Sequence, residues 1–146
     1  MPNSLGYATS SIEGRVSVEF FDPSSDSQSE KYAFKCHRQP SSSLDGTDVV
    51  YPVNALAFHP QLGSFASGGG DGVVALWDAG AKRRIRQYQK YTASVAALAW
   101  SCDGRFLAVG VCPGLEDGVE EYSGEGRTRV FVRELAEGEA RGKKGK

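Results

Sequence analysis

The 146-residue sequence has no long apolar run and no strong charge imbalance. No run approaches the roughly 18 apolar residues of a membrane span. The first residues, MPNSLGYATSS, have neither the basic flank nor the apolar stretch of a signal peptide. The 17 lysines and arginines nearly balance the 18 aspartates and glutamates, so the net charge of -1 provides no field that would attract nucleic acid or a membrane surface. The composition therefore predicts neither direct nucleic-acid binding nor membrane binding.

Cysteine and histidine are also scarce. The three cysteines, Cys36, Cys102 and Cys112, are odd in number and not closely paired, which favours a reducing compartment over a disulfide scaffold. Cys36 and His37 are adjacent in an expected strand and should point to opposite faces, so we expect no metal site and no cofactor. His59 precedes a proline in an expected turn and has no partner residues at a usable spacing. We therefore expect no catalytic residue and a protein that is not an enzyme.

The glycines and valines that are present suggest short strands joined by tight turns, and a repeat organises them. The segment VNALAF at 53–58 matches VAALAW at 95–100, an offset of 42 residues, and the same offset carries FASG at 65–68 onto LAVG at 107–110. A partial third copy lies at 11–18. A period of about 40–45 residues built from short strands is typical of the blades of a WD-repeat β-propeller. The predicted fold class is therefore all-β, a WD-repeat propeller.

The best copy also contains the polar residues of a WD blade at the expected spacing. Ser67 is followed four residues later by Asp71, and Trp77-Asp78 comes six residues after Asp71. In WD blades a serine, an aspartate and a tryptophan form a hydrogen-bonded set with a histidine from the preceding loop. His37 is the nearest candidate for the fourth member, although the insertion 38–50 separates it from its usual place. We predict a structural tetrad of Ser67, Asp71, Trp77 and His37.

Ten strands are expected, which make one complete blade and two incomplete ones. They are residues 6–11, 15–21 and 31–37 in blade one; 53–58, 64–67, 73–77 and 84–88 in blade two; and 94–100, 106–111 and 128–133 in blade three. Residues 1–135 are therefore interpreted as about three of the seven blades at the C-terminal end of a longer propeller, with residues 136–146 as a disordered basic tail. Its unpaired edges should prevent a closed monomeric ring.

Two stretches are more specific than a general WD repeat: SSIEGRVSVEFFDP at 10–23 and KYAFKCHR at 31–38. They resemble the WD-repeat proteins of the spindle assembly checkpoint, and the likeness extends over residues 6–135. Glu13 and Glu19 occupy the aspartate and tryptophan positions of blade one, as they do in the resembled family. A sister family, the nuclear mRNA-export propellers, shares the blade but differs in these stretches.

The resemblance implies a non-catalytic scaffold that binds a short helical motif, called GLEBS, of the checkpoint kinase and its kinase-like relative. It also implies a nuclear location, recruitment to kinetochores in mitosis and contact with ubiquitin-ligase machinery through the checkpoint complex. The basic positions of the family that meet the acidic motif correspond to Arg15, Lys35 and Arg38. Two alternatives stay open at this point: an mRNA-export adaptor that binds a nucleoporin, and a truncated product without function.

Overall fold

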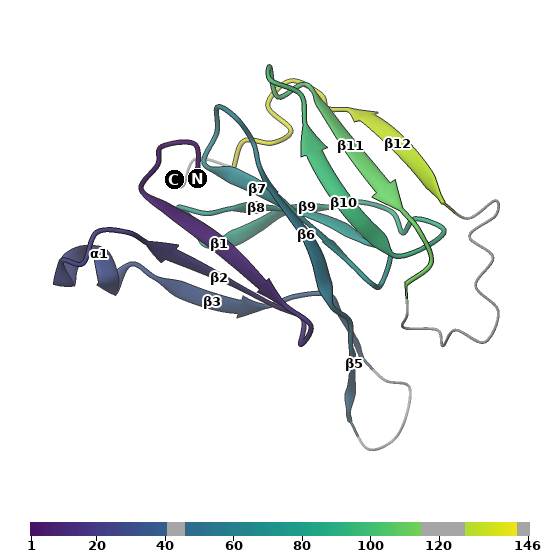
Figure 1. Ribbon diagram of the computed structural model, residues 1–146, viewed down its shortest axis with the longest axis horizontal. Helices are drawn as coiled ribbons and strands as arrows, with labels where there is room; N and C mark the ends of the chain where they lie inside the picture. The colour runs from purple at the N-terminus through teal and green to yellow at the C-terminus, as the bar shows by residue number, and fades with distance from the viewer. Residues whose placement is uncertain (41–45, 115–127, 143–146) are drawn as a thin grey trace.

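The computed structural model describes residues 1–40, 46–114 and 128–142 (Figure 1). Its strands and single short helix follow in the order β1 (Gly6–Ser11), β2 (Arg15–Phe20), α1 (Ser25–Ser29), β3 (Tyr32–Lys35), β4 (Arg38–Pro40), β5 (Asp48–Val50), β6 (Val53–Phe58), β7 (Ser64–Gly69), β8 (Val74–Asp78), β9 (Arg83–Gln87), β10 (Val95–Trp100), β11 (Phe106–Val111) and β12 (Arg129–Glu134). In this part of the chain no helix is long and apolar enough to cross a membrane.

Three antiparallel sheets correspond to the three expected blades. Strands β1-β2-β3 form blade one, β6-β7-β8-β9 form blade two and β10-β11-β12 form blade three. The strand bounds agree with the expected ones to within one or two residues. The pairing of β6 with β7 shifts register between Val53 and Ala55, and that of β10 with β11 shifts between Val95 and Ala97. An irregularity that repeats at the same 42-residue offset shows that the sequence repeat is a structural repeat, and the all-β, partial-propeller prediction is confirmed.

The core lies between the blades, with blade two in the middle (Figure 1). Strand β7 is buried along its whole length, because consecutive side chains point to opposite faces and both faces are covered. Phe65 belongs to the cluster shared with blade one, where it packs with Val16 and Val18. Ala66 belongs to the cluster shared with blade three, together with Leu107 and Val109. Side chains on the two faces of β7 therefore pack against the two neighbouring blades.

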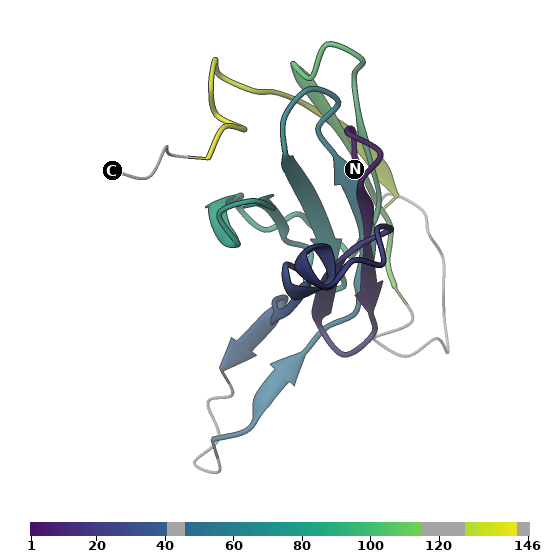
Figure 2. The ribbon, with the colours of Figure 1, turned by 90° about the vertical axis from the view of Figure 1, so that its left-hand side faces the viewer.

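Two segments outside the expected strands contain short elements. Helix α1 has no buried residue and is capped at its N-terminus by Ser24, whose hydroxyl accepts a hydrogen bond from the Ser27 amide. Polar capping can hold one helical turn without the apolar periodicity that would reveal it in a sequence. In the 38–50 insertion, β4 and β5 pair as an antiparallel hairpin. Figures 1 and 2 show β5 extending away from the three blades.

The segment after β12 differs from its expected disorder. Glu139 accepts a hydrogen bond of 2.7 Å from the Tyr88 hydroxyl and lies 3.3 Å from an Arg86 nitrogen. Ala140 is buried. The prediction of a tail disordered from residue 136 is therefore wrong for 136–142, because one carboxylate and one small apolar side chain attach this turn to blade two. Residues 143–146, the basic end, lie outside the described residues, as does the acidic stretch 115–127.

Candidate functional site

A hydrogen-bonded chain of four side chains joins blade one to blade two. His37 Nδ1 lies 2.9 Å from Asp71 Oδ1, and His37 Nε2 lies 2.8 Å from Ser67 Oγ. The Trp77 indole donates to the same Ser67 oxygen at 2.8 Å. A carboxylate only accepts, so His37 donates from Nδ1, and in the neutral imidazole Nε2 accepts from the Ser67 hydroxyl. The four residues proposed for the tetrad thus meet in one network, in which three are buried and Trp77 is half-buried.

Local backbone geometry explains how His37 reaches this position. Strand β3 ends at Lys35, and His37 adopts a left-handed φ of 49°, which turns the chain inward. The ring then lies against Gly69, where any β-carbon would collide with it. Cys36 and His37 are both buried and lie beyond the end of β3, so the expectation that they are adjacent residues of a strand is wrong. The insertion that follows His37 does not prevent these contacts, since β4 pairs with β5 and β5 extends away from the blades (Figure 1).

The hydrogen-bonded order serine, histidine, aspartate is also that of a hydrolase triad. Here Ser67 is fully buried, and its oxygen is already engaged by the Trp77 N–H. A nucleophile must be accessible to its substrate, and this one is enclosed between two blades. The arrangement therefore ties strands together. His59, the other histidine, accepts at Nδ1 from the Gln61 and Leu62 amides, as expected of a turn residue.

Three cations gather at one end of blade one. Arg15 begins β2 and Lys35 ends β3, and the two are direct partners in the antiparallel pairing. Both are exposed, and neither forms an ion pair within the described residues. Arg38 donates from Nη2 to the Glu13 carbonyl at 3.0 Å, which fixes it beside the β1–β2 turn that carries Arg15. The residues proposed for partner binding thus form one basic cluster.

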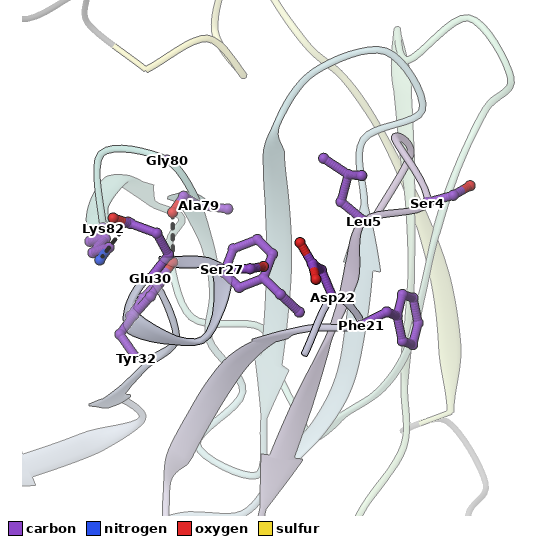
Figure 3. A pocket seen from close by; sticks show the side chains of 11 residues that line it. Ser4, Leu5, Phe21, Asp22, Ser27, Glu30, Tyr32, Ala79, Gly80 and Lys82 are labelled. Carbon is purple, nitrogen blue, oxygen red and sulfur yellow. Dashed lines mark hydrogen bonds and ion pairs between the residues drawn. The ribbon is translucent and has the colours of Figure 1, made fainter. Parts of the chain in front are cut away.

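A groove of about 360 Å³ lies at the opposite end of β3. Figure 3 shows its lining, in which the Tyr32 hydroxyl donates to the Ala79 carbonyl at 2.9 Å and Lys82 pairs with Glu30 at 3.3 Å. Phe20 adds apolar surface. Burial, with the nearby Asp78 carboxylate, raises the pKa of Tyr32 to about 12, so the hydroxyl stays protonated as a donor. Lys82 therefore lies away from the basic cluster and within an existing ion pair.

The described residues contain no group of three or more histidine, cysteine, aspartate or glutamate side chains that could hold a metal ion. The three cysteines are free thiols. Burial, with a smaller contribution from Asp71, raises the pKa of Cys36 to about 12. A thiol with so high a pKa is protonated at neutral pH and is a poor nucleophile or metal ligand.

Sequence reasoning missed the residues that support these positions. The β4–β5 pair, which contains Arg38, lies in the 38–50 insertion, for which the sequence predicted no strand. The attachment of Glu139 to Tyr88 had no local signal, because the two residues are 51 positions apart.

Comparison with known proteins extends this description. The family model "WD domain, G-beta repeat" matches residues 38–78 and 82–118, together more than half of the chain. "Mitotic checkpoint protein BUB3.1" of Arabidopsis thaliana is 49% identical over 142 residues, which are 97% of this chain and 40% of the relative. "Mitotic checkpoint protein bub3" of Dictyostelium discoideum is 45% identical over 130 residues, 89% of this chain and 38% of the relative. The "mRNA export factor" of Rattus norvegicus is 31% identical over 132 residues, 90% of this chain and 36% of the relative.

These similarities confirm the resemblance to the checkpoint proteins and the weaker one to their export-factor sisters. The chain spans about two fifths of the length of the relatives that it matches. Together with the three blades and the Ser67–His37–Asp71 network, the matching repeats show that the chain belongs to the WD-repeat family.

Proposed function

We propose that this chain is part of a WD-repeat scaffold of the spindle assembly checkpoint. In this proposal it lies in the nucleus, binds GLEBS-type motifs of the checkpoint kinase and its kinase-like relative, brings them to kinetochores in mitosis, and contacts ubiquitin-ligase machinery through the assembled complex. Arg15, Lys35 and Arg38 would receive the acidic side chains of the motif. Similarity to relatives named as mitotic or spindle assembly checkpoint proteins supports this role.

The observation that carries the proposal is the direct pairing of Arg15 with Lys35. Side chains directly opposite each other on antiparallel strands have β-carbons about 4.5–5.5 Å apart, and like charges in that position are destabilising. An acidic side chain bound between the two cations would relieve their repulsion. A pair that is unfavourable in isolation and exposed to solvent is therefore well suited to an acidic partner.

The surrounding structure supports a rigid platform. Arg15 and Lys35 lie on paired strands, and the backbone amide of Cys36 donates to the Gly14 carbonyl at 2.9 Å just beyond that pairing. Arg38 is held by the Glu13 carbonyl. Groups that are already ordered lose little conformational entropy on binding, which favours affinity. A short segment could therefore bind without rearranging the blade.

Charge reversal tests the proposal. Arg15→Glu or Lys35→Glu should weaken binding of a synthetic glutamate-containing GLEBS-type peptide by about 30-fold or more, because a lost charge contact at an interface costs about 2–5 kcal/mol. Fluorescence anisotropy with the labelled peptide measures the effect. Lys82→Glu is the control, since it makes the same change of charge at the opposite end of β3. Equal affinities for the control and the two variants would rule out the basic cluster as the binding site.

The mRNA-export role is the second candidate, because relatives named as export factors are also similar to this chain. Their identities of 31% and 34% are lower than the 44–49% of the checkpoint proteins, which favours the checkpoint role. Affinity purification from mitotic and interphase extracts separates the two candidates. Checkpoint kinases on the bait support the first role, whereas a nucleoporin without kinases supports the second.

A further inference from the structure

A polar cleft of about 220 Å³ lies next to the tetrad, between blade one and blade two. One side of the cleft is formed by residues 35–39, which run from the end of β3 into β4. The other side is formed by the outer strands β8 and β9. Trp77 lines the cleft and packs against Phe34 of blade one with ring centroids 4.5 Å apart.

A bulge in blade two directs two side chains of β9 toward this cleft. Arg84 pairs with Trp77 and Gln87 pairs with Ala75, with a register shift between Leu76 and Trp77. Ala75 and Trp77 share a face of β8, so Arg84 and Gln87 share the corresponding face of β9 although they are three residues apart. Arg84 donates from Nη1 to the Gln87 oxygen at 2.8 Å. A regular strand would have placed these two residues on opposite faces.

Three cations, Lys35, Arg38 and Arg84, and one carboxylate, Asp71, line the cleft. Arg38 uses Nη2 for the Glu13 carbonyl, but its Nε is buried and has no hydrogen-bond partner among the described residues. Buried donors are rarely left unpaired, so this one calls for an acceptor. The carboxylate of the cleft, Asp71, is engaged by His37 and by the Val73 amide. Arg38 and Arg84 together therefore create an excess of positive charge and of N–H groups.

We propose that this cleft binds one carboxylate side chain, glutamate or aspartate, of a peptide that at the same time contacts the basic cluster. This inference rests on the proposed function and adds Arg84 and Gln87 of blade two to the binding surface. Guanidinium groups bind carboxylates through charge-assisted hydrogen bonds, which are stronger than neutral ones. Arg38 borders both the basic cluster and the cleft. A segment that extends over Arg38 would thus bridge blades one and two.

The test uses Arg84→Gln, which removes the charge but keeps a hydrogen-bonding side chain near Gln87. With the labelled glutamate-containing peptide, the affinity should fall about tenfold, and Arg84→Lys should give a smaller loss because it keeps the charge without the fork of N–H groups. Arg86→Gln is the matched control, since Arg86 is on the same strand opposite Leu76 and contacts Glu139 instead. Unchanged thermal melting of the variants shows that the fold is intact.

Peptides in which single glutamates are replaced by glutamine identify the group that enters the cleft. One of these peptides should bind the wild type and the Arg84→Gln variant with equal affinity. A different peptide should bind the wild type and the Arg15→Glu variant with equal affinity. If Arg15→Glu weakens binding but Arg84→Gln does not, the cleft is not a subsite and the proposed function still stands. If neither variant changes the affinity, both proposals fail. If Arg84→Gln and Arg86→Gln weaken binding equally, the effect is a general one of net charge and the subsite is refuted.

Discussion

Removal of the Asp71 carboxylate is the sharpest test of how the blades are held together. Asp71 is buried, and one of its oxygens accepts from the imidazole N–H of His37 at 2.9 Å and from the Val73 amide at 3.1 Å. Asp71→Ala leaves both donors inside the protein without an acceptor. The substitution affects the junction between blade one and blade two as well as the turn that begins β8.

The expected loss in the free energy of unfolding follows from the two donors that lose their acceptor. A buried polar group that loses its partner costs about 1–3 kcal/mol. The two losses are not independent, because His37 also contacts Ser67 and can shift once its aspartate is gone. We therefore expect Asp71→Ala to lower the free energy of unfolding by about 2–4 kcal/mol. Trp77→Phe, which removes a single bond to Ser67, should cost less, about 0.5–1.5 kcal/mol.

Urea denaturation measures these differences, followed by tryptophan fluorescence for Asp71→Ala and by circular dichroism for Trp77→Phe, which lacks the reporting indole. Trp77 reports directly on the network, and a Trp100→Phe background removes the signal of the second tryptophan. Asp26→Ala, which changes an exposed aspartate in helix α1, is the control and should leave the midpoint unchanged. An unfolding midpoint for Asp71→Ala that equals that of wild type would refute the view that the tetrad stabilises the fold.

Two further predictions concern a close contact and a pH dependence. Gly69→Ala should lower the urea midpoint, because the added methyl group would collide with the His37 ring, whereas Gly63→Ala should not, since the space around Gly63 is open. Burial lowers the pKa of His59 below its ordinary value of 6.5, although a hydrogen bond to the Gly104 backbone opposes the shift. The unfolded state then takes up the proton first, so stability is full above about pH 6.5 and falls as the pH drops through the lowered pKa. His59→Asn should flatten the stability profile between pH 7.5 and 5.5, and an unchanged slope would contradict this assignment.

Local patterns in the sequence were sufficient to predict the strands and turns of the three blades. Two copies of a 42-residue repeat, with alternating side chains and Asp-Gly turns, indicated which residues form strands and where they turn. The spacing of Ser67, Asp71 and Trp77 marked the network for the same reason. All three lie within one hairpin and its turn, so their separation along the chain fixes their separation in space.

Contacts between distant segments were decided only by the tertiary structure. The sequence named His37 only as the nearest candidate for the tetrad, because the insertion between it and Asp71, 34 positions further on, left open whether the two side chains meet; the structure shows that they do. Arg84 and Gln87 meet because a bulge breaks the two-residue period that a strand pattern assumes. Glu139 is ordered because Tyr88 offers its hydroxyl across 51 positions of chain. Each of these features depends on how packed blades bring backbone segments together, and no neighbouring residue in the sequence carries that information.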